Sequence, residues 1–89
     1  MAHYAVHSPF ETDERFISHY TDPNKSQQAR AFATLIEGMD KSLGDILDKL
    51  EDMGIAENTL IIFLGDNGGD APLGDAADYG SSAPFKGKK

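Results

Sequence analysis

The clearest pattern in the chain is a stripe of apolar positions that recur at steps of three and four residues. The stripe lies between residues 26 and 53 and comprises Ala29, Phe32, Leu35, Ile36, Met39, Leu43, Ile46, Leu47 and Leu50. This spacing places apolar side chains on one face of a helix. The sequence therefore predicts an amphipathic helix over residues 26–53.

Both ends of the predicted helix carry capping residues. Asp22, or Ser26 one turn later, can accept a hydrogen bond from a free backbone N–H group at the start of the helix. Gly54 suits the left-handed residue that follows a helix, which allows Ile55 to fold back on Leu50 in a Schellman motif.

Charged residues on the helix have the spacing of ion pairs. Glu37 precedes Lys41 by four residues, and Asp45 precedes Lys49 by four residues. Pairs in this order contribute about 0.2–0.5 kcal/mol each to helix stability.

Residues 59–64 (Thr-Leu-Ile-Ile-Phe-Leu) are apolar at successive positions rather than alternating. This composition is typical of a strand in the middle of a parallel sheet that helices cover on both faces. Such a strand needs neighbours for its backbone groups, and no other stretch of the chain is strand-like. The pattern predicts one helix and one buried-type strand of an α/β domain, with too little else to complete it.

The two ends of the chain lack a sustained period. Residues 1–25 mix aromatic side chains, histidines and prolines, so we expect an ordered loop with a short helical turn around residues 13–20. Residues 65–89 hold most of the glycines and are expected to form a long loop of the kind that carries active-site residues.

Charge and composition exclude several function classes. The 89 residues carry 15 acidic and 8 basic side chains, a net charge of −7, and 3 of the basic residues (Lys86, Lys88 and Lys89) lie in the last four positions. We therefore expect neither a nucleic acid nor a membrane as partner, and no apolar run approaches the length of a membrane helix. The terminal lysines can bind an anion or simply be solvated.

A chemically distinctive sequence, Gly-Asp-Asn-Gly-Gly (residues 65–69), follows the predicted strand directly. In open α/β sheets ligands bind beyond the carboxyl ends of the strands. The Asp66 carboxylate and the Asn67 amide oxygen are hard donors of the kind that Ca²⁺ or Mg²⁺ prefers. The alternative is a plain turn, for which these residue types are equally suited.

His7 is the histidine with the most defined context. It lies in Val-His-Ser-Pro, where Pro9 restricts the preceding residue to extended geometry. It can act as a general acid or contact an oxyanion, or it can be an ordinary surface histidine. His3 and His19 are expected at the surface.

Four segments, in order, resemble a known family. They are Tyr-Ala-Val-His-Ser-Pro (residues 4–9), Ile-Glu-Gly-Met-Asp-Lys-Ser-Leu-Gly (36–44), the stretch 50–68 that ends in Phe-Leu-Gly-Asp-Asn-Gly, and Ala-Pro-Phe-Lys-Gly-Lys-Lys (83–89). Together they resemble the middle of a sulfatase of the arylsulfatase type, in the alkaline-phosphatase-like superfamily. The resemblance implies an α/β fold, of which this chain is a fragment with one long amphipathic helix, one buried-type strand and long loops.

The resemblance also implies a role for each matching position. Asp66 and Asn67 resemble the second half of a calcium shell whose first half lies outside this chain. His7 resembles the histidine that contacts the sulfate and the leaving-group oxygen. The ending Pro-Phe-Lys-Gly-Lys-Lys resembles Pro-Leu-Arg-Gly-Gly-Lys, which puts Lys89 on the sulfate-binding lysine, although a shift of one residue would select Lys88.

In this family a formylglycine, made from Cys or Ser in a C/S-x-P/A-x-R motif, attacks sulfur while calcium and lysine hold the sulfuryl oxygens. The chain has no cysteine and no such motif. We therefore expect residues 1–89 to be a single partial domain, an internal segment of a sulfatase that acts on a sulfated small molecule or glycan. The segment alone should be inactive and should self-associate.

Two alternatives remain open. A phosphonate or phosphodiester hydrolase of the same superfamily would share the Asp-Asn pair. A free-standing interaction module would use the apolar stripe of the helix to bind a partner, but the exposed apolar strand would then be an aggregation hazard.

Overall fold

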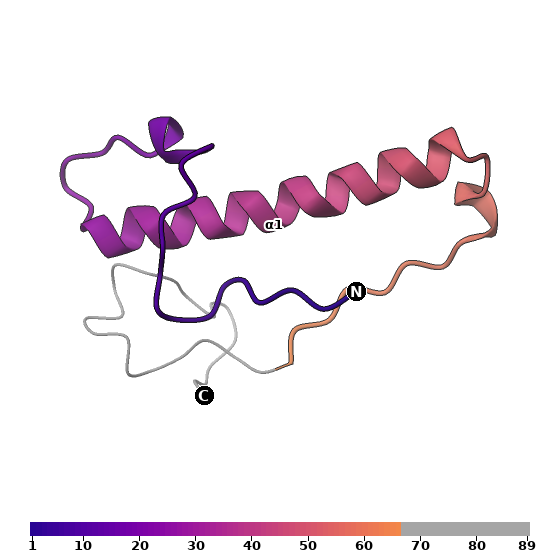
Figure 1. Cartoon of the computed structure of the whole chain (residues 1–89), viewed down its shortest axis with the longest axis horizontal. Coiled ribbons are helices and arrows are strands. Elements are labelled where there is room, and N and C mark those ends of the chain that lie inside the picture. Colours follow the sequence, from indigo (N-terminus) through magenta and orange to yellow (C-terminus); the bar gives the residue numbers. More distant parts are fainter. Residues whose placement is uncertain (67–89) are drawn as a thin grey trace.

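The computed structural model describes residues 1–66, which form one long helix and two short 3₁₀ helices (Figure 1). Helix α1 spans Gln27–Asp52, η1 spans Ile17–His19 and η2 spans Ala56–Asn58. The apolar stripe thus gives the helix that it predicts, and the short helical turn expected near residues 13–20 is η1. Within residues 1–66 no helix combines the length and the apolar composition that a membrane crossing requires.

The first residue of α1 is set by Ser26. Its side-chain oxygen accepts a hydrogen bond of 3.1 Å from the backbone N–H of Ala29. Asp22, the other capping candidate, instead closes a turn before the helix, because its Oδ1 accepts a hydrogen bond of 2.9 Å from the backbone N–H of Asn24.

The Schellman motif predicted at the other end is present. Gly54 adopts a left-handed φ of 69°, a conformation that a residue without Cβ adopts at little cost. Its N–H donates to the Glu51 carbonyl at 2.8 Å, and the N–H of Ile55 donates to the Leu50 carbonyl at 3.1 Å. The last carbonyl groups of α1 are thereby satisfied.

The ion pairs on α1 differ from those predicted. Lys41 pairs with Asp45 at 2.5 Å, and the ion pairs of the described residues include neither Glu37–Lys41 nor Asp45–Lys49. Glu37 instead accepts a hydrogen bond of 2.8 Å from His19 of η1. The reason is tertiary packing. Because η1 lies beside this part of the helix, His19 becomes a partner for Glu37, and the i,i+4 rule covers only pairs within the helix.

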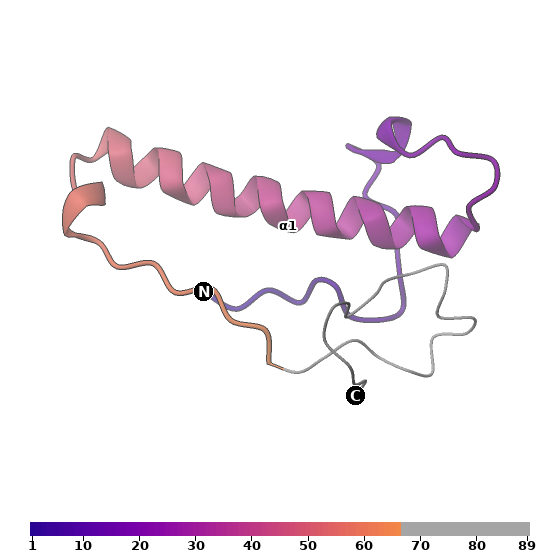
Figure 2. The same cartoon turned by 180° about the vertical axis from the view of Figure 1, so that it is seen from behind.

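The N-terminal residues and the chain after η2 both run along one side of α1 (Figures 1 and 2). The Phe10 ring lies 5.1 Å from the Phe32 ring of the helix. Within the described part, the buried residues are limited to Ala29, Ala31 and Thr34, all in the first half of α1, and of these Thr34 alone is fully buried. The core is therefore small and lies where the loop before η1 crosses the helix.

The strand predicted over residues 59–64 is not confirmed. The described residues contain no strand, and this segment runs beside α1 without a paired neighbour. Its apolar side chains are largely exposed, 85% for Leu60 and 83% for Leu64. A strand requires partners for its backbone N–H and C=O groups, and no other segment between residues 1 and 66 supplies them.

Candidate functional site

His7 lies in an exposed turn near the start of the chain. Its backbone N–H donates to the Tyr4 carbonyl at 3.1 Å, and the Tyr4 and His7 rings lie 5.4 Å apart. Nδ1 is 2.6 Å from the carbonyl oxygen of Ser8. Because a carbonyl only accepts, Nδ1 carries the proton, and Nε2 is the ring nitrogen left available to a ligand.

The other predicted site residues lie at or beyond the end of the described chain. Asp66 is the last described residue and is exposed. Asn67 lies outside the described residues, as do the terminal lysines (Lys86, Lys88 and Lys89). No hydrogen bond or ion pair joins His7 to Asp66 in the described part, so their roles stay predictions.

Residues 1–66 can be checked for enough oxygen ligands to form a calcium site. Calcium takes 6–8 oxygen ligands in proteins. Asp66 is the right type of ligand, but no group of three acidic or histidine side chains in the described part is arranged to hold a metal ion. These residues therefore do not make a calcium shell by themselves.

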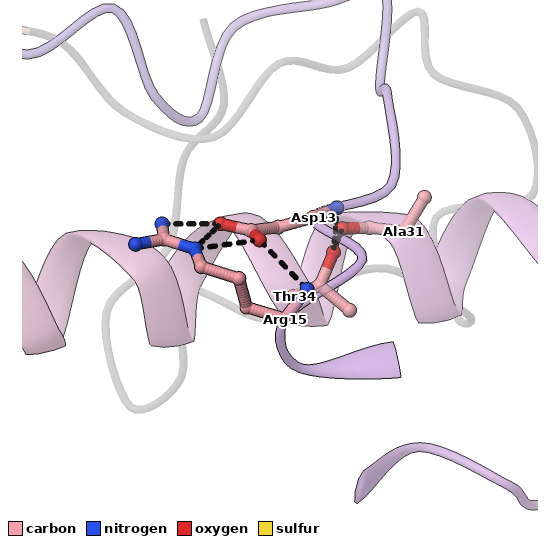
Figure 3. A network of polar contacts seen from close by, with 4 residues as sticks. All are labelled: Asp13, Arg15, Ala31 and Thr34. Atoms are coloured by element: carbon pink, nitrogen blue, oxygen red, sulfur yellow. Dashed lines mark hydrogen bonds and ion pairs between the residues drawn. The ribbon is translucent and has the colours of Figure 1, made fainter. Parts of the chain in front are cut away.

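A polar network that the sequence did not suggest fixes the loop before η1 to the helix (Figure 3). The Thr34 hydroxyl donates to the Ala31 carbonyl at 2.6 Å and accepts from the backbone N–H of Asp13 at 2.9 Å. The Arg15 guanidinium binds both carboxylate oxygens of Asp13, with Nη2 to Oδ2 at 2.6 Å. This hydrogen bond holds the pKa of Asp13 below its ordinary value of 3.8.

Gly38 allows this network to lie close to the helix. A Cβ atom at this position would lie 3.0 Å from Oδ2 of Asp13. A glycine within an amphipathic stripe is the sequence signal for such a close approach, although the sequence does not identify what approaches.

A second network surrounds Glu37. Its carboxylate accepts from His19 Nδ1 at 2.8 Å and from the hydroxyl of Tyr20. The hydrogen bond to Glu37 raises the pKa of Tyr20 above its ordinary value of 10.0. His19 is exposed, as expected, but it is also a tether between η1 and α1.

Comparisons with known proteins agree with the resemblance of the motifs. The sequence model of the sulfatase family matches residues 1–87. Arylsulfatase J of Mus musculus is 30% identical over 89 residues, which is 100% of this chain and 14% of that protein. N-acetylgalactosamine-6-sulfatase of Homo sapiens is 32% identical over 81 residues, covering 91% of this chain and 14% of that protein.

A bacterial relative is more similar over a shorter stretch. The ulvan-active sulfatase of Formosa agariphila is 53% identical over 34 residues, which is 38% of this chain and 6% of that protein. The chain thus spans about 14% of the length of the relatives that match most of it. The match of the family along nearly all of the sequence leads to one conclusion: this chain belongs to the sulfatase family.

Proposed function

We propose that this chain is the part of a sulfate-ester hydrolase that carries a leaving-group histidine and half of the oxyanion machinery. The observation that supports the proposal is the family match over residues 1–87, together with relatives that are themselves sulfatases. Since the chain corresponds to 14% of those relatives, the activity is proposed for the polypeptide that contains it, and we expect the 89 residues alone to be inactive.

His7 is the proposed general acid. Cleavage of a sulfate ester leaves negative charge on the departing oxygen, and a proton supplied there lowers the barrier. The Ser8 carbonyl holds Nδ1–H, so the protonated ring would present Nε2–H to the leaving oxygen in a fixed orientation. After transfer the neutral ring keeps its proton on Nδ1.

Asp66, Asn67 and Lys89 are the proposed oxyanion residues, with Lys88 as the alternative to Lys89. Asp66 and Asn67 would supply two oxygen donors to a calcium ion, whose charge would offset that of the sulfuryl oxygens. The lysine would make a charge-assisted hydrogen bond to the sulfate. The remaining calcium ligands and the nucleophile motif would come from sequence outside this chain.

The leaving-group role of His7 is tested by substitution in the complete polypeptide. We expect His7→Ala to reduce kcat by roughly 10²–10⁴-fold for alkyl sulfates, whose leaving groups need the proton. The reduction should be much smaller for 4-nitrophenyl sulfate. His3→Ala is the matched control and should leave both rates unchanged. Equal losses on both substrates would contradict the role of general acid.

The oxyanion residues are tested in the same polypeptide. Asp66→Ala and Asn67→Ala should remove calcium-dependent turnover, whereas Asp48→Ala, an exposed carboxylate on α1, should not. Lys89→Ala should weaken inhibition by free sulfate by about 1.5–3 kcal/mol. Efficient hydrolysis of bis(4-nitrophenyl) phosphate without hydrolysis of aryl sulfates would instead identify a phosphodiesterase of the superfamily.

A further inference from the structure

A groove of about 530 Å³ lies between the loop that follows η1 and the first three turns of α1. Its volume is in the range of sites for small molecules. The helix contributes an apolar floor made by Ala29, Phe32, Ala33 and Ile36. The loop contributes Tyr20 as an aromatic wall. This lining suits an apolar or aromatic body.

Two cations at this groove have no carboxylate partner among the described residues. Lys25 and Arg30 both line it, and the ion pairs among the described residues join other side chains. The Nε atom of Arg30 is buried and has no hydrogen-bond partner. A guanidinium can only donate, and a buried donor without an acceptor is unfavourable. The part of the chain that the structure describes therefore offers no acceptor to Arg30 Nε.

The acidic groups nearby are already engaged. Asp22 is the only carboxylate among the described residues that line the groove, and its Oδ1 accepts from both the backbone N–H and the Nδ2 of Asn24. Glu37 accepts from His19 and Tyr20. Among the described residues that line the groove, Lys25 and Arg30 carry two positive charges against one negative charge on Asp22, in a chain whose net charge is −7. This excess of one positive charge favours an anion as the occupant.

We propose that this groove binds a small molecule in which an oxyanion, sulfate or carboxylate, is attached to an apolar or aromatic body. The oxyanion accepts hydrogen bonds from Arg30 and Lys25, and the body packs on Phe32 and Ile36. The inference goes beyond the proposed function, because it concerns binding alone and holds whether or not the polypeptide hydrolyses sulfate esters.

The test is a titration of the ¹⁵N-labelled 89-residue chain with the substitution Ile62→Lys, which lies outside the groove and favours the monomer, followed by amide chemical shifts. The probes are phenyl sulfate, benzoate and uncharged phenol, which share a ring and differ in the oxyanion. We expect saturable shifts confined to residues 19–36 with the two anions, and binding of phenol weaker by about tenfold or more. A preference between the anions identifies the headgroup, and either preference supports the proposal. Equal binding of phenol, or shifts spread along the chain, would overturn it.

Variants assign the binding to the two cations. Arg30→Gln should weaken phenyl sulfate binding by about tenfold or more, and Lys25→Gln should weaken it by a smaller factor. Lys49→Gln is the matched control, because it removes the same charge from the far end of α1, and its affinity should be unchanged. If Arg30→Gln loses helix content by circular dichroism, Lys25→Gln, which precedes the helix, decides the question. Unchanged affinity in Lys25→Gln and in a folded Arg30→Gln would refute the site.

Discussion

Gly38 and Gly44 are two glycines of the same helix in different surroundings. A Cβ at Gly38 would meet Asp13 Oδ2 at 3.0 Å, whereas a Cβ at Gly44 meets nothing within 4 Å. Glycine in a helix interior costs about 1 kcal/mol relative to alanine. One of these glycines therefore permits the contact between loop and helix, and the other only weakens the helix.

This difference predicts that the same substitution changes the stability of α1 by different amounts at the two positions. Gly44→Ala should stabilise α1 by about 1 kcal/mol, because it gains helix propensity without a clash. Gly38→Ala should gain clearly less, since the Asp13 carboxylate must move away from Arg15, and the pKa of Asp13 should rise toward 3.8. Thermal unfolding at 222 nm and a carboxyl titration by NMR measure the two effects. Equal stabilisation by both substitutions would show that the Asp13 network does not constrain the helix.

Tyr20 makes the stability of the folded chain depend on pH in the alkaline range. Its pKa is raised because Glu37 accepts a hydrogen bond from the neutral phenol. The folded state thus favours the protonated form, so the stabilisation is complete below about pH 10, the ordinary pKa, and is lost as pH rises through the raised value. Glu37→Ala should return the pKa of Tyr20 toward 10, and Asp48→Ala should leave it unchanged. The Tyr20 ring signals, followed by NMR against pH, report both values.

At the scale of elements, the predictable parts are those whose determinants are local. Helix α1 follows from a periodic stripe and from caps within a few residues of each end, Ser26 and Gly54. Residues 59–64 have the composition of a strand, but a strand depends on neighbours that the described chain does not contain. The ion pair of Glu37 was also not predictable, because its partner His19 lies 18 residues away.

The candidate site also has features that the sequence predicts and features that it does not. His7, Asp66 and Asn67 are candidates that the sequence offers, because each lies in a short contiguous motif. The proton position of His7 cannot, because it depends on the approach of the Ser8 carbonyl. The groove beside Arg30 was not found from the sequence, since it brings together a loop and a helix face that no short motif joins.

The N-cap residue Ser26 is predicted to contribute to the stability of α1. Ser26→Ala should destabilise α1 by about 1 kcal/mol, because the Ala29 N–H loses its acceptor at the start of the helix. Ser42→Ala, within the same helix, is the control and should be neutral or slightly stabilising. Amide hydrogen exchange of residues 27–30 locates the effect. A loss of protection spread equally over the whole helix would assign the change to global unfolding instead of to the cap.

At the scale of the whole molecule, the described chain buries little and exposes much apolar surface. The buried residues of the described part are the three in α1, while Leu60, Ile62, Phe63 and Leu64 are each more than 60% exposed. Membership of the sulfatase family implies an alkaline-phosphatase-like fold for the complete domain. Between residues 1 and 66 nothing covers this surface in that way, and apolar patches of this kind drive association.

We therefore expect the isolated chain to form dimers or larger species through residues 59–64 or through the apolar stripe of α1. Two chains that pair along residues 59–64 would satisfy their backbone groups and bury side chains that are otherwise in water. Ile62→Lys should shift the population toward monomer in sedimentation velocity, because it places a charge within this contact. Asn58→Lys adds the same charge at a polar, exposed position of η2 and should not. A wild-type chain that sediments as a clean monomer at micromolar concentration and melts cooperatively would mean that the few buried residues of α1 suffice to stabilise it.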